Sequence, residues 1–424
     1  MGKAVVITGD VEDDHERQGT VWTGTAHVLA AVIGSGVLAL AWSVAQLGWL
    51  LGPAVLLGFA MVTFYTSTLL ADCYRFPLPT PVFLCGVAQY ANLWGTMVGY
   101  TITATASMMA VKRANCFHRE GHSAGCRVSG NTFMLVFGVM EVALSQFPSL
   151  ENITWVSVVA AAMSFAYSLI GLCLCAGTLG GATAASSTAK TWNAFQALGN
   201  IAFAYTFAEV LIEIQDTLKS PPPENKTMRK VSMYGIGLTA VFYLSVGCMG
   251  YAAFGDNAPG NILTGFGFYE PYWLVDIANL CIVLHLAGAY QVFAQPIFAA
   301  VEKSVASRWP EAKFVSTVYK VRLPFSTGGR TLSFAAPKVA LRTAMVVLTT
   351  VVAALVPFFN SVLGLLGPPP SGRLQAKVRP WTVKWVLLQG LSLVCLLVSL
   401  FASVGSVADI IGSLKQSAPF KVQY

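Results

Sequence analysis

Residues 21–49 read VWTGTAHVLAAVIGSGVLALAWSVAQLGW, an apolar run with Gly34-Ser35-Gly36 at its middle and His27 two turns earlier. A membrane helix leaves no backbone group unpaired towards lipid, so a Gly-Ser-Gly interruption is tolerated where the freed N–H and C=O groups face protein or a bound solute. Secondary transporters bind small ionic substrates at interrupted helices near the membrane midplane. The run therefore predicts a transporter; a close helix contact mediated by glycine is the alternative.

The composition is that of an integral membrane protein. Of the 424 residues, 55% are hydrophobic and 11% are charged, which is too little charge to cover a soluble protein of this size. Apolar segments long enough to cross about 30 Å of hydrocarbon lie at residues 21–46, 53–71, 83–111, 132–148, 154–177, 192–213, 231–253, 272–300, 339–358 and 381–405. Barrel strands would alternate apolar and polar residues over shorter segments. The predicted fold class is an all-α polytopic membrane protein.

Loop charge predicts the orientation. Lys and Arg gather in residues 219–230 and 303–338, and the positive-inside tendency places both loops in the cytosol. Residues 1–20 are polar, carry five acidic residues and show no cleavable secretion signal, so we expect a cytoplasmic N-terminal tail. The membrane domain is then expected over residues 21–405, followed by a C-terminal tail over residues 406–424. This orientation puts the loop that contains Cys116 and Cys126 outside, where the two could form a disulfide.

Ionisable groups inside membrane spans are costly, so each is a candidate functional residue. His27 and His285 are the histidines well inside spans, and a histidine titrates near physiological pH and can relay a proton. Either one could instead donate to a neighbouring carbonyl and only fix helix packing. Glu209, inside the sixth span, is a further candidate for proton coupling, whereas Glu141 and Asp276 are assigned to packing.

A second irregular helix is expected in the sixth span, because Phe203-Ala204-Tyr205-Thr206 follows Gly199. In a fold of two inverted five-helix repeats, the first and sixth helices occupy equivalent positions. Residues 34–36 and 203–206 would then form one site. The alternative is that these aromatic residues only pack.

Long stretches of the chain carry a family resemblance. They are residues 19–57 (GTVWTGTAHVLAAVIGSGVLALAWSVAQLGWLLGPAVLL), 66–75 (TSTLLADCYR), 99–118 (GYTITATASMMAVKRANCFH), 195–222 (FQALGNIAFAYTFAEVLIEIQDTLKSPP), 247–280 (GCMGYAAFGDNAPGNILTGFGFYEPYWLVDIANL) and 284–299 (LHLAGAYQVFAQPIFA). These stretches closely resemble plant amino acid permeases of the amino acid/auxin permease family. The resemblance implies a plasma-membrane symporter that couples proton entry to amino acid uptake, on an eleven-helix variant of the inverted-repeat fold.

The resemblance also implies a substrate site. Carried over by position, the residues that would bind the α-amino and α-carboxylate groups through their backbone are Ile33, Gly34, Ser35 and Gly36. Exposed N–H groups and the positive end of a half-helix would attract the anion. The pocket would be completed by Phe203, Ala204, Tyr205 and Thr206. His27 and His285 match histidines of the family, and their role in coupling is our hypothesis.

The sequence departs from the family pattern in three places. The commonest family form has Asp where this chain has Asn200, and Glu209 could replace that acidic proton acceptor. The connection after the second span is shortened. After PFFNSVLGLLG, a polar loop at residues 368–373 stands where relatives continue with an apolar span, and residues 359–367 are too short to cross the membrane at 1.5 Å per residue. A re-entrant half-helix or an inverted last span would resolve the topology, but we expect a truncated tenth helix with a partial span at residues 359–367.

The predicted function is a proton-coupled secondary active symporter that imports amino acids across the plasma membrane by alternating access. Its expected partners are an amino acid, protons and the bilayer. The alternative is a non-transporting membrane receptor or interaction protein that binds amino acids, or a defective truncated relative. The sequence has no Gly-rich phosphate loop, nucleophile elbow or metal-ligand cluster, so we predict neither an enzyme nor a metal, organic cofactor or nucleic-acid partner.

Overall fold

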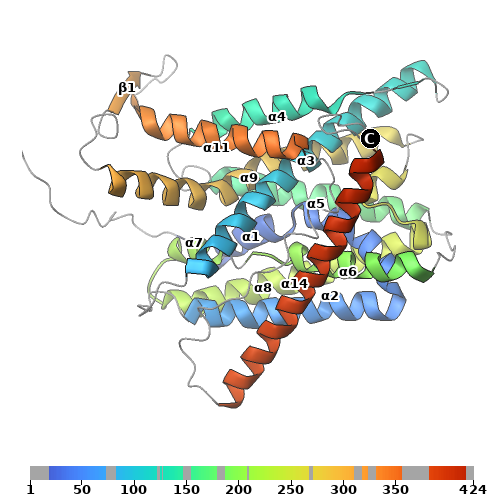
Figure 1. Cartoon of the computed structure of the whole chain (residues 1–424), viewed down its shortest axis with the longest axis horizontal. Helices are drawn as coiled ribbons and strands as arrows, with labels where there is room; N and C mark the ends of the chain where they lie inside the picture. The colour runs from blue at the N-terminus through green and yellow to red at the C-terminus, as the bar shows by residue number, and fades with distance from the viewer. Residues whose placement is uncertain are drawn as a thin grey trace, which may run out of the picture.

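The computed structural model describes residues 19–72, 83–121, 125–126, 128–146, 154–178, 187–207, 210–266, 271–309, 318–322, 331–355 and 382–416. This part of the chain is almost entirely helical, and most helices run along one common direction, with α3 and α14 crossing at a slant (Figure 1). The predicted partial span at residues 359–367 and the shortened connection after the second span lie outside the described residues.

The first predicted span is an interrupted helix. Helix α1 (Val21–Val32) begins after Thr20, whose Oγ1 accepts from the Thr23 N–H at 3.3 Å while Thr23 Oγ1 accepts from the Thr20 N–H at 2.7 Å. After a break at residues 33–34, the chain continues as a short 3-10 helix, η1 (Ser35–Ala39), and then as α2 (Leu40–Asp72). At Gly48, where φ is 81°, α2 changes direction. This bend separates the first two predicted spans.

The remaining spans follow in the predicted order. The first half continues with α3 (Phe83–Glu120), α4 (Gly130–Leu144) and α5 (Thr154–Gly177). The second half contains α6 (Ser187–Ala204), α7 (Leu211–Asp216), α8 (Glu224–Phe254), η3 (Gly255–Asn257), η4 (Ile262–Phe266), α9 (Tyr272–Arg308), α11 (Ala336–Leu355) and α14 (Val383–Gln416).

Helices α3, α9 and α14 extend beyond their predicted C-terminal ends. Helices α3 and α9 continue past residues 111 and 300 into charged sequence, because backbone hydrogen bonding does not stop where hydropathy falls. Helix α14 extends to Gln416 through the start of the expected C-terminal tail.

A small hairpin qualifies the all-α prediction. Strand β1 (Val318–Arg322) pairs antiparallel with β2 (Thr331–Ala335), with Val318 opposite Ala335. The hairpin lies in the basic connection between α9 and α11, at the end of the bundle where α7 lies (Figure 1). It does not contribute to the membrane core.

Helix length and packing place the core around the interrupted helix. Within the described residues, five helices are long and apolar enough to cross a membrane: Ser35–Asp72, Val158–Gly177, Glu224–Asn257, Tyr272–Arg308 and Pro337–Leu355. Helix α8 packs along α1 and α2, α9 packs between α3 and α5, and α6 packs against α2 and α14. The chain is therefore a multi-pass membrane protein.

Candidate functional site

The break in α1 is held by a tyrosine of another helix. The Ile33 N–H still donates to Leu29 O at 2.9 Å, and the Gly34 N–H donates to Val32 O at 2.8 Å. The Tyr167 hydroxyl of α5 lies 3.2 Å from Ile33 O and 3.0 Å from Gly34 O. Because both carbonyls are buried, this hydroxyl supplies a donor that the lost helical hydrogen bonds would have provided.

A second break follows α6, as the equivalence of the first and sixth helices predicts. The helix ends at Ala204, and the chain becomes helical again at α7. The Tyr243 hydroxyl of α8 lies 3.0 Å from Ala204 O and also contacts Val32 O. One hydroxyl therefore bridges the carbonyls of both interrupted helices.

The two breaks touch through their backbones. A Cβ atom placed on Gly36 would lie 2.8 Å from Ala204 Cα and 2.9 Å from Ala204 Cβ. No side chain fits in that space, so glycine is required at position 36. The structure thus brings residues 34–36 and residues 203–206 together.

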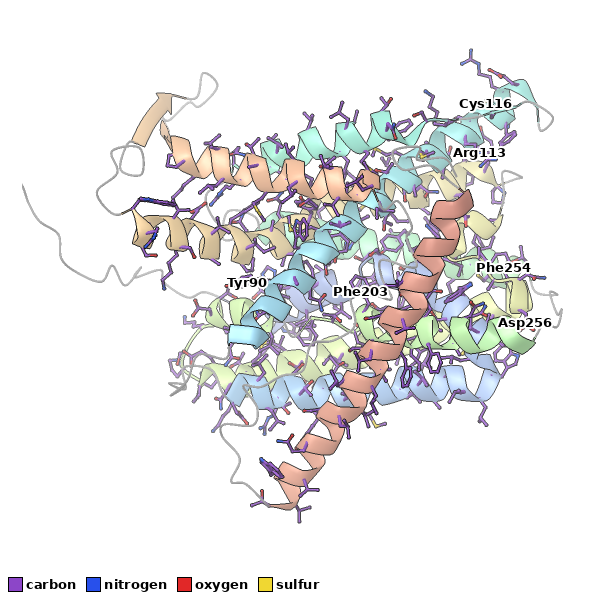
Figure 2. The ribbon with its side chains drawn as sticks, viewed as in Figure 1. Tyr90, Arg113, Cys116, Phe203, Phe254 and Asp256 are labelled. Carbon is purple, nitrogen blue, oxygen red and sulfur yellow. A yellow bond between two sulfur atoms is a disulfide. The ribbon has the colours of Figure 1, made fainter. Side chains whose placement is uncertain are left out.

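A small cavity opens between the breaks. Six of the eight predicted binding residues line it: Gly34, Ser35, Gly36, Phe203, Ala204 and Thr206. Phe203 lies near the centre of the bundle (Figure 2). The other two, Ile33 and Tyr205, are buried beside the cavity without lining it. Ser35 Oγ is buried and has no hydrogen-bond partner among the described residues, so it is available to a solute.

His285 faces the α1 break. Its Nδ1 lies 2.9 Å from Ala160 O and 2.7 Å from Ser164 Oγ, so we assign the Nδ1 proton to the Ala160 carbonyl. Nε2 is buried and has no partner among the described residues. A Cβ atom on Gly34 would lie 3.7 Å from this nitrogen and 3.1 Å from the Tyr100 hydroxyl. In the neutral ring, Nε2 is therefore an acceptor that faces the break.

The other coupling candidates differ in their surroundings. His27 is half-buried on α1 and does not line the cavity. Asn200 is fully buried, and neither its Oδ1 nor its Nδ2 has a hydrogen-bond partner in the part of the chain that the structure describes. Glu209 lies outside the described residues. Of the three candidates among the described residues, His285 is the one that lies against the break.

Sequence reasoning missed several residues of the site. Thr96, Tyr100 and Phe293 line the cavity from α3 and α9, and Tyr167 and Tyr243 donate to the buried carbonyls at the breaks. A tyrosine in an apolar span needs a partner for its hydroxyl, which is a general signal. That signal does not identify the partner.

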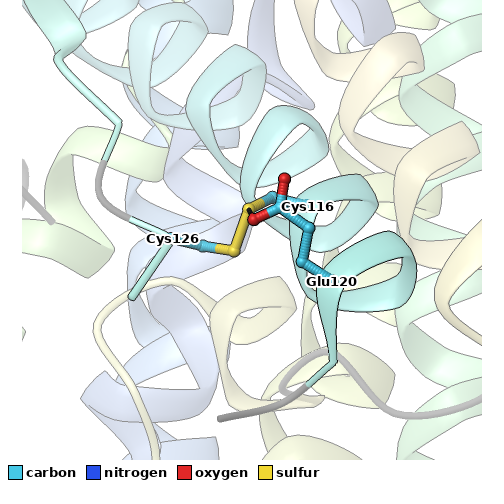
Figure 3. Close-up of side chains that lie close together, drawn as sticks. All are labelled: Cys116, Glu120 and Cys126. Atoms are coloured by element: carbon cyan, nitrogen blue, oxygen red, sulfur yellow. Dashed lines mark hydrogen bonds between the residues drawn. A yellow bond between two sulfur atoms is a disulfide. The ribbon is translucent and has the colours of Figure 1, made fainter. Parts of the chain in front are cut away.

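Cys116 and Cys126 form a disulfide near the C-terminal end of α3, with Cα atoms 6.0 Å apart (Figure 3). Glu120 lies beside it, with Oε2 3.8 Å from Cys116 Sγ. A cysteine binds a metal ion as its thiolate, and both sulfurs are consumed in the disulfide, so in the oxidised protein this cluster offers a metal ion only the Glu120 carboxylate.

Two interrupted helices around an enclosed cavity define a membrane transporter with an inverted-repeat fold. A family model described as transmembrane amino acid transporter protein matches residues 17–412, so the chain belongs to that family. Amino acid permease 2 of Arabidopsis thaliana is 50% identical over 452 aligned residues, which cover 96% of this chain and 91% of the relative. Amino acid permease 4 of the same plant is 49% identical, and the alignment covers 96% of this chain and 96% of that relative.

A solved structure has the same fold. The crystal structure of MhsT in complex with L-phenylalanine superposes with a TM-score of 0.53 at 11% identity, over 94% of this chain and 99% of that chain. MhsT has the LeuT fold, so the predicted fold class is confirmed. The family resemblance is confirmed as well. Because the relatives are named permeases, the chain is a transporter and not an enzyme.

Proposed function

We propose that this protein imports amino acids across the plasma membrane by proton symport. Membership of the transporter family and about half-identity to named amino acid permeases support the substrate class. The observation that carries the proposal is the backbone contact of two interrupted helices around a small cavity.

The cavity offers groups for both charges of an amino acid. Ser35 and Gly36 begin the helical run Ser35–Asp72, whose first N–H groups lack intrahelical acceptors and carry the positive end of the helix dipole. These groups bind the carboxylate in our proposal. The carbonyls of Val32 and Gly34 can accept from the substrate ammonium when the tyrosine hydroxyl on each one donates to its other acceptor, Ala204 O or Ile33 O.

The position of His285 supports a role for this residue in proton coupling. A proton on Nε2, which faces Gly34, would place a cation next to the site where Ser35 and Gly36 bind the carboxylate. The proton and the substrate would then stabilise each other, and by linkage each raises the affinity for the other by the same factor. His27, Asn200 and Glu209 are secondary candidates for proton coupling. Asn200 is uncharged, so its side chain could take part only through hydrogen bonds.

Alternating access requires one end of the bundle to open while the other closes. Next to the start of α1, the Gly19 N–H donates to Thr217 O at 2.9 Å, and the Lys219 N–H donates to Gly19 O at 2.9 Å. These bonds join α1 to the segment after α7. In our proposal they close the cytoplasmic side and break when the first and sixth helices rock apart.

The proposed orientation places the N-terminus in the cytosol. The disulfide lies at one end of the bundle, where Cys116 is labelled in Figure 2, whereas α7 and the basic hairpin lie at the opposite end. Disulfides persist in oxidising surroundings, and basic loops favour the cytosol. Both features support this orientation.

The proposal predicts amino acid uptake that rises with external acidity. We would express the chain in transport-deficient yeast and measure uptake of labelled neutral amino acids at acidic and at neutral external pH. Acid-stimulated uptake that a protonophore abolishes is the expected result, because the proton gradient drives import. Surface display without uptake would instead favour the alternative of a non-transporting relative.

The same cells can be used to test the orientation of the protein in the membrane. With a membrane-impermeant thiol reagent, Cys116 and Cys126 should be labelled after an external reductant is added and not before. Protection of both cysteines after external reduction in intact cells, with labelling after permeabilisation, would reverse the proposed orientation.

A further inference from the structure

We propose that Glu141 is a proton-binding site of the transport cycle, separate from the substrate cavity. This inference rests on the proposed proton-coupled function. Glu141 lies on α4, near the end remote from the disulfide, and its side chain is fully buried. Its Oε2 accepts from Gln291 Nε2 at 2.7 Å, whereas Oε1 is buried without a hydrogen-bond partner among the described residues.

The surroundings of Glu141 favour an acid that gains and loses a proton. A buried carboxylate with an unpaired oxygen is costly, and a neutral carboxylic acid costs much less. Arg342 binds other acceptors, because its Nε binds Glu302 Oε1 at 2.7 Å and its Nη1 donates to Ser145 O at 2.9 Å. Glu141 is therefore held by an amide and not by a salt bridge.

Gln291 and Ser145 can satisfy both states of the acid. Both polar atoms of the Gln291 amide lie within hydrogen-bond distance of Ser145 Oγ. Nε2 is 3.1 Å from it and Oε1 is 3.4 Å from it. The ionised form of Glu141 accepts from Nε2, as in the structure. When Glu141 is protonated, a flip of the amide lets the acid O–H donate to Oε1 while Nε2 donates to Ser145 Oγ. The same three side chains thus bind the proton or release it.

The cluster lies between the cavity region and the protein surface. Gln291 lies six residues beyond His285 on α9, about 9 Å along the helix. In the other direction, Glu302 also pairs with Lys338 at 3.2 Å, and the Lys338 side chain is 60% exposed. A proton from a hydronium ion on the cavity side forms an O–H bond at Glu141. That bond breaks when water on the Glu302 side takes the proton, which restores the carboxylate.

The helices packed against α4 bring few other titratable groups near Glu141. Helix α9 brings Tyr290, whose ring packs edge-on against Phe137 at 6.2 Å, and Glu302. Helix α11 brings Arg342 and Lys338, already paired with Glu302. Helix α3 brings Lys112 over Phe133, about 12 Å along α4 from Glu141.

Separating proton movement from substrate movement tests the proposal. Glu141→Gln keeps the size of the side chain and fixes it in a neutral form. We expect this variant to lose acid stimulation of net uptake, by tenfold or more, because it cannot carry the proton. Amino acid exchange under counterflow needs no net proton transfer and should stay within about twofold of the wild type. Asp276→Asn is the matched control, because Asp276 also accepts from an amide, Asn115 Nδ2 at 2.7 Å, but lies partly exposed at the other end of α9.

The outcomes distinguish this proposal from the proposed function. Wild-type acid stimulation retained in Glu141→Gln would overturn the role of Glu141 alone, as would equal loss of uptake and exchange at normal surface display. A wild type without acid stimulation would contradict the proton-coupled function itself. If the Glu141→Gln variant does not reach the cell surface, the Glu141→Asp variant tests the proposal instead. Its shorter chain should displace the pH midpoint of uptake, and an unchanged midpoint would overturn the proposal.

Discussion

Replacing Gly36 by alanine is expected to reduce amino acid uptake on the order of 100-fold, the penalty typical of displacing a bound reactant by ~1 Å. The added Cβ would lie 2.8 Å from Ala204 Cα. Backbone atoms cannot rotate away as the end of a flexible side chain can, so the interrupted helices must separate. Separation moves the substrate-binding backbone of residues 32–36 away from Phe203 and Thr206 on the other side of the cavity, and the substrate then loses one set of contacts.

Gly237→Ala on α8 is the matched control, because a Cβ there meets nothing within 4 Å. Initial uptake rates should be compared at equal surface display. The control should transport as the wild type does. Normal uptake by Gly36→Ala would show that the two breaks need not touch for transport.

Replacing Tyr243 by phenylalanine is the second large effect that we expect. The substitution removes the hydroxyl between Val32 O and Ala204 O but keeps the ring, which packs against Tyr205 with centroids 5.1 Å apart. A buried carbonyl that loses its donor costs about 1–3 kcal/mol. We therefore expect lower thermal stability in detergent, and uptake reduced about tenfold, since 1.4 kcal/mol corresponds to a factor of ten.

Tyr234→Phe tests whether the effect belongs to the bridge. Tyr234 is on the same helix, is 47% exposed and stacks on Trp22, so the loss of its hydroxyl should change neither unfolding temperature nor uptake. Equal behaviour of the two variants would mean that the Tyr243 hydroxyl does not couple the interrupted helices.

The sequence predicted the first break because three small residues interrupt an otherwise apolar run. The second break was predicted at residues 203–206 from the equivalence of two helices, and α6 ends at Ala204. The tyrosines that bind these breaks could not be found in the same way. Tyr167 is 133 residues from Gly34 along the chain, and a hydroxyl's acceptor depends on tertiary packing.

The roles of the two histidines also could not be distinguished from the sequence. Both His27 and His285 lie in apolar segments with unusual neighbours, and hydropathy does not distinguish them. The structure separates them, because Ala160 and Ser164 hold the His285 ring towards Gly34, whereas His27 lies on the first part of α1 away from the cavity lining. Glu141 was assigned to packing for a similar reason: its partner Gln291 is 150 residues away.

The hydropathy pattern also predicted spans that are shorter than the helices in the structure. The predicted spans end where Lys112 and Lys303 bring charge, but the helices continue because their hydrogen bonds are local and polar side chains are solvated beyond the membrane. The β1–β2 hairpin was missed because its basic connection was interpreted only as a determinant of topology.

The central claim, that an amino acid binds between the two interrupted helices, is tested most directly by protection of a single thiol. In a Ser35→Cys variant, the new thiol would replace a hydroxyl that lines the cavity and is buried without a partner among the described residues. A transported amino acid should slow its alkylation by a small reagent, and a His27→Cys variant outside the cavity lining should show no such protection. Alkylation of the residue 35 thiol at the same rate with and without a saturating transported amino acid would contradict the claim.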